Sequence, residues 1–532
     1  MRILFNANIH TLDLERPRAT ALVIDDHPAY AGRILAIGRD QRIKAEFGQR
    51  AAAEDMRGST IIPGLIDAHL HLRNYAHSLD NVNCDTLTRK ECLDRVQHKT
   101  KTQPPGSWVQ GHGWNQNIWP EGYGTSADLD AIAPRHPVYL TGSSLHVAWV
   151  NSAALTSAGI TRKTPDPPNG KIQRDAENLP TGILFENAMK LVTAVIPQPS
   201  HDQHVAAIKR AHQQLWRLGL TGVHDFDRRR SFLALQDLHE QGDLQLRVLK
   251  HLPVERLEDA IGVGLRSGFG DDMLKIGAVK VFMDGALGPQ TAAMFAPYDN
   301  EPENRGLLFM DGEELLERAQ QAALGGLEMT VHAIGDRANH EVLMAFQQLR
   351  AFENQHNLPA RRHRIEHVQL LAPADLTRLA KLDLVASVQP LHATSDMHAV
   401  DAYWGARGVH AYAFRTLLDH GTRMAFGSDA PVEAPNPFWG IHAAVTRQHA
   451  DGKPGPDGWY PQQRLTVMEA LLAYTTGAAY AAGMEDRQGM LKPGYLADLL
   501  ILDSDPFACE PGQLKDIVPQ GTMLGGDWVY RS

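Results

Sequence analysis

Long apolar runs and long runs of like charge are both missing from this sequence. No stretch of about 18 uninterrupted apolar residues occurs, so we expect no membrane-spanning helix and no membrane partner. The 52 basic and 62 acidic residues give a net charge of −10. With no long block of one sign, this balance argues against a surface for nucleic acid or anionic lipid.

Cysteine is also scarce. The three cysteines, Cys84, Cys92 and Cys509, are too few and too scattered for a disulfide framework or a thiolate zinc site. The first ten residues lack the apolar core of a secretory signal. Together these features favour a soluble protein in a reducing compartment, and we expect a cytoplasmic location.

The overall composition is that of a globular protein, with one unusual feature. Hydrophobic residues make up 43% and charged residues 21% of the 532 positions, which fits neither a disordered chain nor a coiled coil. Histidine is unusually frequent, with 26 residues. Many of these must be structural, but the supply is ample for a metal site with nitrogen ligands.

Eight short apolar or β-branched runs alternate with helical patterns along the chain, which is typical of βα units and a parallel sheet. These runs span residues 64–71, 221–226, 244–251, 276–283, 329–334, 363–368, 384–389 and 423–428. Eight strands with helical crossovers close most simply into a (β/α)8 barrel of the TIM type. We therefore predict an α/β fold with a barrel domain over residues 61–484.

Two regions of the sequence are not accounted for by the eight βα units of a barrel. His71 and Thr221 lie 150 positions apart, several times a normal βα connection, so we predict an inserted subdomain over residues 74–215. An insertion after a barrel strand lies over the catalytic mouth and would form a lid or pocket wall; the alternative is a stabilising cap without substrate contact. Residues 1–60 and 485–532 read as short strands and turns, and we predict that they pair into one composite β-sandwich.

Metal-ligand residue types stand at the predicted carboxyl ends of four strands. His69-Leu-His71 ends the first run, and a period of two points both imidazoles to the same side. His332 ends the fifth run, His367 the sixth and Asp429 the eighth. The His-x-His spacing alone is weak evidence, because a lone histidine at a strand end is more often a hydrogen-bonded core residue. Four imidazoles and a carboxylate at one barrel rim favour a metal site.

Lys280 interrupts an otherwise apolar strand, Ile276-Gly-Ala-Val-Lys280-Val-Phe-Met. A buried ammonium group is costly unless it is paired or neutralised. One interpretation is a side chain that reaches solvent or pairs with Asp284. The other is a neutral amine that adds CO2 and bridges two metal ions as a carbamate.

Several motifs occur in order along nearly the whole chain. They read Pro63-Gly-Leu-Ile-Asp-Ala-His-Leu-His71, Val279-Lys-Val-Phe-Met-Asp-Gly-Ala-Leu-Gly288, Val331-His-Ala-Ile-Gly-Asp-Arg-Ala-Asn339, His363-Arg-Ile-Glu-His367 and Phe426-Gly-Ser-Asp-Ala-Pro-Val-Glu433. With these motifs the sequence resembles the amidohydrolase superfamily, and within it the amidohydrolase-3 branch that includes YtcJ-like hydrolases and N-substituted formamide deformylases.

The resemblance implies a role for each of six residues, and it also implies the composite β-sandwich. The implied ligands are His69 and His71 for one ion, His332 and His367 for the other, carbamylated Lys280 as a bridge, and Asp429 as both ligand and base. Imidazole and carboxylate suit Zn²⁺ best, although manganese, iron or cobalt can occupy such a set. We expect one or two divalent ions in each chain.

This ligand set predicts a metal-dependent hydrolase that cleaves a non-peptide carbon–nitrogen bond of an amide, formamide or N-acyl compound. A metal-activated hydroxide would attack the carbonyl, with Asp429 first taking the proton and then giving it to the departing nitrogen. One alternative is a mononuclear deaminase, which in this superfamily carries Glu three residues after the fifth-strand histidine, where this chain has Gly335. The other is a catalytically inactive barrel used for binding.

Residues for substrate contact are harder to single out. The candidates are Trp114, Trp119, His146, Arg337 and Trp404. Aromatic rings near the mouth would accommodate an apolar substituent and Arg337 a carboxylate, but packing is a competing interpretation for each. The segment that ends at His146 departs from the Arg-x-Asp-Gly-His stretch typical of the family. We expect a small-molecule substrate and a homodimer.

Overall fold

The computed structural model describes residues 1–27, 32–116, 119–142, 147–168, 170–299 and 301–532. The chain forms two compact units, one of residues Met1–Tyr75 with His204–Ser532 and one of residues Ala76–Gln203. In the described ranges, no helix combines the length and apolar character that crossing a bilayer requires.

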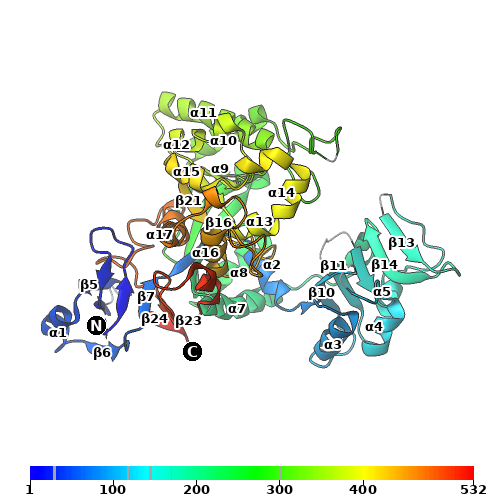
Figure 1. Ribbon diagram of the computed structural model, residues 1–532, viewed down its shortest axis with the longest axis horizontal. Coiled ribbons are helices and arrows are strands. Elements are labelled where there is room, and N and C mark those ends of the chain that lie inside the picture. The colour runs from blue at the N-terminus through cyan, green and yellow to red at the C-terminus, as the bar shows by residue number, and fades with distance from the viewer. Residues whose placement is uncertain (28–31, 117–118, 143–146, 169, 300) are drawn as a thin grey trace. The chain divides into compact units, whose positions relative to one another are not determined.

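Eight parallel strands form the centre of the first unit (Figure 1). In sheet order they are β8 (Leu65–Leu70), β15 (Leu220–Asp225), β16 (Arg247–Pro253), β17 (Leu274–Phe282), β18 (Met329–Ala333), β19 (Arg364–His367), β20 (Val385–Val388) and β21 (Arg423–Phe426). Beyond the last strand, Leu70 bridges Ala430 in parallel, and the amide of His71 donates to the carbonyl of Ala430 at 2.8 Å. These contacts join the first strand to the last at the carboxyl-terminal rim, which confirms the predicted barrel.

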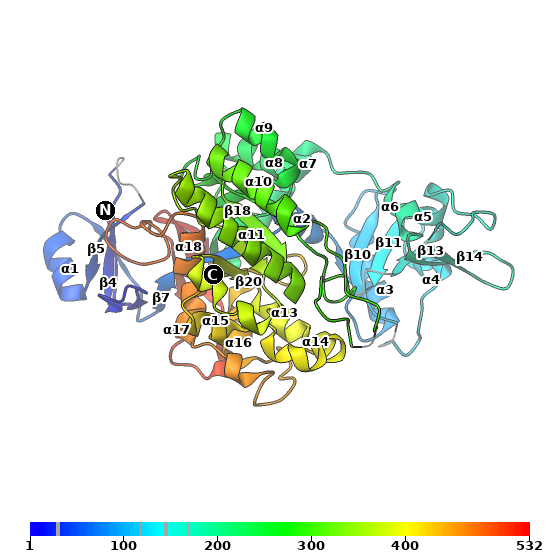
Figure 2. The same ribbon diagram turned by 90° about the horizontal axis from the view of Figure 1, so that it is seen from above.

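Helices follow the strands and cover the barrel. Those of this unit are α7 (His201–Arg217), α8 (Arg229–Glu240), α9 (Leu257–Gly262), α10 (Gly312–Gly325), α11 (Asp336–Gln355), α12 (Arg378–Lys381), α13 (Pro390–Ser395), α14 (Met397–Tyr403), α15 (Phe414–Asp419), α16 (Pro437–Thr446), α17 (Val467–Leu472) and α18 (Ala478–Ala481), while α2 (Leu72–Ser78) leads out of β8. Figure 2 shows α9, α10 and α11 side by side on the outside. Residues Val342, Leu343, Phe346 and Leu349 form the buried face of α11 at helical spacing.

The two ends of the chain form two sheets. The first contains β5 (Ile34–Gly38), β4 (Ala21–Ile24), β1 (Arg2–Phe5) and β6 (Ala52–Asp55), with α1 (Asp40–Phe47) beside it. The second contains β24 (Asp527–Arg531), β23 (Pro519–Leu524), β22 (Leu499–Leu502), β7 (Thr60–Pro63), β2 (Asn8–His10) and β3 (Arg18–Ala19). Leu4 and Leu22 from the first sheet share one core with Ile9, Leu499 and Met523 from the second. Burying one apolar face of each sheet in this way stabilises both.

The second unit has a core of its own. Its sheet contains β13 (Gly170–Arg174), β14 (Pro180–Glu186), β12 (Val147–Val150), β11 (Val138–Gly142), β10 (Val109–Trp114) and β9 (Val82–Asn83), and its helices are α3 (Arg89–Thr100), α4 (Ser126–Ile132), α5 (Ser152–Ser157) and α6 (Met189–Thr193). The unit ends at Gln203, earlier than the predicted 215. Helix α7 belongs to the barrel because the indole of Trp216 donates to the carbonyl of Gln245 at 2.8 Å and Lys209 pairs with Asp243. A role of this unit as lid or wall stays a prediction.

Candidate metal centre

The carboxyl end of β8 is tied to the loop that follows β21. The buried carboxylate of Asp67 accepts hydrogen bonds from the amides of His69 and Ser428, both at 3.0 Å, and from the hydroxyl of Ser428 at 2.5 Å. Burial raises the pKa of Asp67 to about 7, against these hydrogen bonds. At Gly427 a Cβ would lie 2.4 Å from the amide nitrogen of His69. Only glycine permits this close approach, which brings the loop against the strand.

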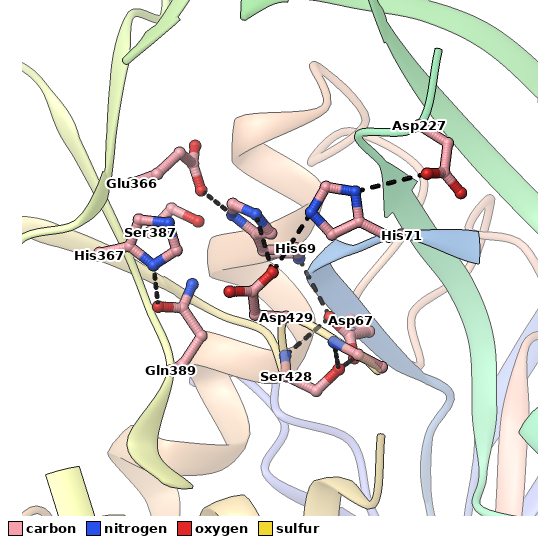
Figure 3. A network of polar contacts seen from close by, with 12 residues as sticks. Asp67, His69, His71, Asp227, Glu366, His367, Ser387, Gln389, Ser428 and Asp429 are labelled. Carbon is pink, nitrogen blue, oxygen red and sulfur yellow. Dashed lines mark hydrogen bonds and ion pairs between the residues drawn. The ribbon is translucent and has the colours of Figure 1, made fainter. Parts of the chain in front are cut away.

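Asp429 lies against His69 of β8 and His71, which directly follows this strand (Figure 3). Its Oδ1 is 3.5 Å from Nε2 of His69 and 3.4 Å from Nε2 of His71. Its backbone amide donates to the carbonyl of His69 at 2.6 Å, which holds the loop in register. Burial would raise the pKa of Asp429, but the imidazoles of His69, His71 and His367 hold it well below its usual range. The carboxylate is therefore ionised beside two imidazoles.

His332 and His367 approach the same centre from β18 and β19. Their ring centroids are 4.5 Å apart, and the ring of His367 is 4.9 Å from that of His69. The donor atoms of His69, His71 and Asp429 lie within 4.8 Å of one another, and so do those of His367, His392 and Asp429. Asp429 is common to both groups, so the two triads form one continuous cluster.

Each of the four histidines at this rim has an acceptor for one ring nitrogen. The acceptors are Glu366 for Nδ1 of His69 (2.6 Å), Asp227 for Nδ1 of His71 (3.5 Å), the carbonyl of Gly285 for Nε2 of His332 (3.0 Å) and Oε1 of Gln389 for Nδ1 of His367 (2.8 Å). The opposite ring nitrogen, Nε2 in three of the rings and Nδ1 in His332, is then available to a metal ion. Metal-bound histidines are oriented by such acceptors. The donor set, imidazoles with one carboxylate, fits a divalent transition-metal ion.

A buried ion pair supports His69 from inside the barrel. Glu366 accepts from Nδ1 of His69, and Nε of Arg364 donates to the other carboxylate oxygen at 2.5 Å. Arg364 also donates to the carbonyl of Ala68 and the hydroxyl of Ser387, both at 2.6 Å. Burial would raise the pKa of Glu366, but Arg364 and His69 hold it well below its usual range. Both charges are satisfied, so the pair forms a rigid support for the imidazole.

Lys280 adjoins this cluster without a carboxylate partner. It is 6% exposed, and its Nζ lies 4.7 Å from the ring centre of Phe226 and 4.6 Å from that of Phe282. Among the described residues Lys280 forms no ion pair with a nitrogen–oxygen distance of 4.0 Å or less. Burial lowers the pKa of Lys280 to about 8, although Glu366 and Asp429 oppose the shift.

Asp284, the predicted alternative partner of Lys280, is used elsewhere. It accepts the backbone amides of Ala293 (2.9 Å), Ile334 (3.0 Å) and Gly335 (2.8 Å). Pairing with Asp284 is therefore not how Lys280 is accommodated, and its low exposure also excludes a side chain that reaches solvent.

Two of the clustered residues have a left-handed backbone that side chains rarely adopt. The φ angles are 73° at His367 and 59° at Asp429, and Val368 follows with 47°. Such conformations persist where the surrounding structure enforces them, and they concentrate at functional sites. The positive φ values occur where the chain leaves β19 and where it passes beyond β21.

Comparison with known proteins agrees with this geometry. The Amidohydrolase family model matches residues 52–530. The chain belongs to the amidohydrolase family.

Relatives cover this amidohydrolase almost from end to end. Putative amidohydrolase YtcJ of Bacillus subtilis is 33% identical over 98% of this chain and 98% of its own length. N-substituted formamide deformylase of Arthrobacter pascens is 29% identical over 99% of this chain and 98% of its own length. The crystal structure of an uncharacterised metal-dependent hydrolase from Pyrococcus horikoshii has a TM-score of 0.79 and 29% identity, covering 96% of this chain and 99% of that chain.

The residues predicted to contact substrate are not gathered at one site of this amidohydrolase, unlike the predicted metal ligands. Trp114 and Trp119 lie in the core of the second unit, and their indoles donate to the carbonyls of Leu140 (2.9 Å) and Thr86 (3.0 Å). Trp404 is fully buried after α14, and Arg337 is exposed in the first turn of α11. His146 lies outside the described residues. Packing accounts for the three tryptophans, and a role of these residues in substrate binding stays a prediction.

The residue pattern of the deaminase alternative does not fit the amidohydrolase barrel. Glutamate would be needed at position 335, where a Cβ would lie 2.0 Å from the carbonyl oxygen of Ala293. That neighbour is backbone and cannot move aside easily. Gly335 is thus required by the packing of the loop after β18.

Several polar residues of the amidohydrolase site were not predicted from the sequence. They are Asp67, Asp227, Arg364, Glu366, Gln389 and His392. Arg364 and Glu366 in Arg-Ile-Glu-His are also charges inside a predicted strand, so the same signal that marks Lys280 could have found both. No comparable local signal exists for His392 or Gln389, because helices and loops carry polar residues for many reasons.

Proposed function

We propose that this amidohydrolase uses divalent metal to hydrolyse a non-peptide carbon–nitrogen bond of a small molecule, of the amide, formamide or N-acyl class. The observation that carries the proposal is the convergence of Asp429 Oδ1 on Nε2 of His69 and of His71, at 3.5 and 3.4 Å. A relative named as a formamide deformylase and a structural relative named as a metal-dependent hydrolase support the same chemistry.

In this proposal His69, His71 and Asp429 would hold one ion, and His332 and His367 would hold a second. Lys280, buried and without a carboxylate partner among the described residues, could add through Nζ to the carbon of CO2 and release one proton to solvent, and the resulting carbamate would supply a carboxylate ligand shared by the metal ions. Zinc is the metal we favour, because its preferred ligands are imidazole and carboxylate. When bound, a divalent ion lowers the pKa of water and polarises a carbonyl group.

Asp429 moves the proton in this mechanism. Its ionised carboxylate takes a proton from the attacking water and then gives it to the nitrogen that leaves, so one residue serves as base and then as acid. The hydrogen bond from Asp429 N to the carbonyl of His69 keeps the carboxylate at the rim throughout. Glu366, Asp227 and Gln389 keep the imidazoles oriented without taking part in proton transfer.

An apolar substrate group is expected beside Phe282. Its side chain is 45% exposed, yet its ring lies 5.1 Å from the ring of His332 and faces Nζ of Lys280 at 4.6 Å. Exposed aromatic surface next to polar catalytic groups is typical of small-molecule sites. N-alkyl or N-aryl amides would cover this surface on binding.

The test is turnover by protein reconstituted with Zn²⁺, using N-substituted formamides, N-acyl amino acids, cyclic amides and esters of graded apolar size. We expect hydrolysis of a carbon–nitrogen substrate, about two divalent ions in each chain, and reversible loss of activity after treatment with a strong chelator. Active protein purified without transition metal would overturn the metal requirement. Release of ammonia from an aminated heterocycle with no amide hydrolysis would favour the deaminase alternative instead.

A further inference from the structure

His392 is a buried histidine whose ring makes no hydrogen bond with any part of the chain that the structure describes. It lies in α13, which follows β20 and begins at Pro390. The residue is 7% exposed, and neither Nδ1 nor Nε2 has a partner among the described side chains and backbone groups. Burying two unpaired polar atoms is unfavourable. Such an arrangement is expected where a bound ligand supplies the missing hydrogen-bond partner.

The ring of His392 faces the catalytic cluster. The donor atoms of His367, His392 and Asp429 lie within 4.8 Å of one another. The rings of His392 and His367 are nearly parallel, at 18°, with centroids 6.1 Å apart. A group bound beside Asp429 is therefore within reach of His392.

One observation and one general property of catalytic metal sites distinguish His392 from a metal ligand. Each of the four histidines assigned to metal has one nitrogen on an acceptor, as with Glu366 for His69 and Gln389 for His367, whereas His392 has none among the described residues. Metal-bound histidines are almost always oriented in that way. Catalytic metal sites also keep a coordination position open for substrate, and a further imidazole ligand would close it.

We propose that His392 donates a ring N–H to the carbonyl oxygen of the substrate. The proposal rests on the proposed amide hydrolysis, in which that oxygen gains negative charge as water attacks the carbon. A fixed donor aimed at this oxygen stabilises the transition state more than the bound substrate. The proton stays on His392 throughout, because Asp429 handles the proton that moves.

The test compares His392→Phe and His392→Asn with the wild type, all loaded with Zn²⁺. Phe keeps the ring volume without a donor, while Asn restores an N–H. We expect both variants to keep the wild-type metal content and His392→Phe to lose about 10²- to 10³-fold in kcat with KM changed much less. His392→Asn should recover part of that loss. The matched control is His212→Phe in α7, which removes another buried imidazole whose Nε2 has no hydrogen-bond partner among the described residues, and it should leave kcat unchanged.

Metal content and the absorption spectrum of bound metal distinguish a hydrogen-bond donor from a metal ligand at position 392. In the Co²⁺-substituted protein, the visible absorption spectrum of His392→Phe should match that of the wild type. Loss of metal or an altered spectrum in both folded variants would make His392 a ligand and overturn the proposal. Unchanged kcat in His392→Phe would overturn it as well.

A binding measurement keeps this test independent of the substrate class. Methylphosphonate mimics the tetrahedral shape and the negative oxygen of the intermediate formed by attack on an amide, and calorimetry measures its affinity for the Zn²⁺-loaded protein. We expect binding at least about tenfold weaker for His392→Phe than for the wild type. Equal binding, or no binding by either protein, would overturn the role of His392. Absence of turnover across all carbon–nitrogen substrates would instead overturn the proposed function.

Discussion

Glu366 accepts a hydrogen bond from Nδ1 of His69 at 2.6 Å, and both side chains are almost completely buried. Arg364 pairs with the same carboxylate, so a guanidinium, a carboxylate and an imidazole follow one another across the inside of the barrel. The imidazole at the end of this series turns Nε2 toward Asp429. The orientation of His69 thus depends on a charged pair that never meets solvent.

Replacing Glu366 by Gln should weaken metal binding. The amide can still accept from His69, but the charge that pairs with Arg364 is lost, and removing such a supporting group typically costs about 10- to 100-fold in metal affinity. Competitive titration with a chromophoric chelator measures the change. Glu353→Gln is the matched control, because Glu353 similarly joins His363 (3.1 Å) and Arg350 (2.7 Å) outside the cluster. Equal metal affinity in the two variants would contradict the role given to Glu366.

Replacing Asp429 by Asn should abolish proton transfer while preserving size and one oxygen donor. We expect turnover to fall by about 10²- to 10⁴-fold, with a much smaller change in melting temperature. Metal content, melting temperature and turnover should be measured on one preparation. A folded variant that retains metal and turns over at nearly the wild-type rate would remove Asp429 from the mechanism.

Replacing Lys280 by Ala should cost the protein one or both metal ions, because the carbamate bridge can no longer form. Acetate or propionate added to this variant should restore part of the metal content by supplying a carboxylate in the space left by the side chain. Elemental analysis with and without the acid measures the effect. Two ions and full turnover in Lys280→Ala would show that no bridge is needed.

Replacing Gly427 by Ala should damage the site although no candidate ligand is itself replaced. The added Cβ would lie 2.4 Å from the amide nitrogen of His69 and 2.8 Å from Oδ1 of Asp67. The nearer neighbour is backbone, so the loop after β21 must shift and carry Asp429 away from the imidazoles. Metal affinity and melting temperature should both fall. Gly512→Ala, where a Cβ meets nothing within 4 Å, should change neither.

Glu469 makes a pH-dependent contribution to stability. Hydrogen bonding to Arg415 lowers the pKa of Glu469 from 4.5 to about 2. Because the pKa is lower in the folded state, the stabilisation is fully present above pH 4.5 and is lost as the pH falls toward about 2. Glu469→Gln should therefore melt below the wild type at pH 7, and the difference should shrink at pH 3. A difference that stays constant between these two pH values would contradict this assignment.

The sequence by itself determined the barrel and the candidate ligands. Alternation of apolar runs with helical patterns is local, and all eight predicted runs overlap strands of the barrel. Lys280 could be singled out because a charge inside an apolar strand is costly unless it is paired or neutralised. The shared direction of His69 and His71 likewise follows from the sequence, because every second side chain of a strand points to the same face.

Only the tertiary structure decided which groups orient those ligands. Glu366 and His69 are 297 positions apart, and no pattern along the chain says which residue of a distant strand faces a given imidazole. The backbone amides that occupy Asp284 and the unpartnered ring of His392 likewise became visible only after folding. The physical reason is that periodicity sets the direction of a side chain within its own element, whereas hydrogen-bond partners depend on the register between elements.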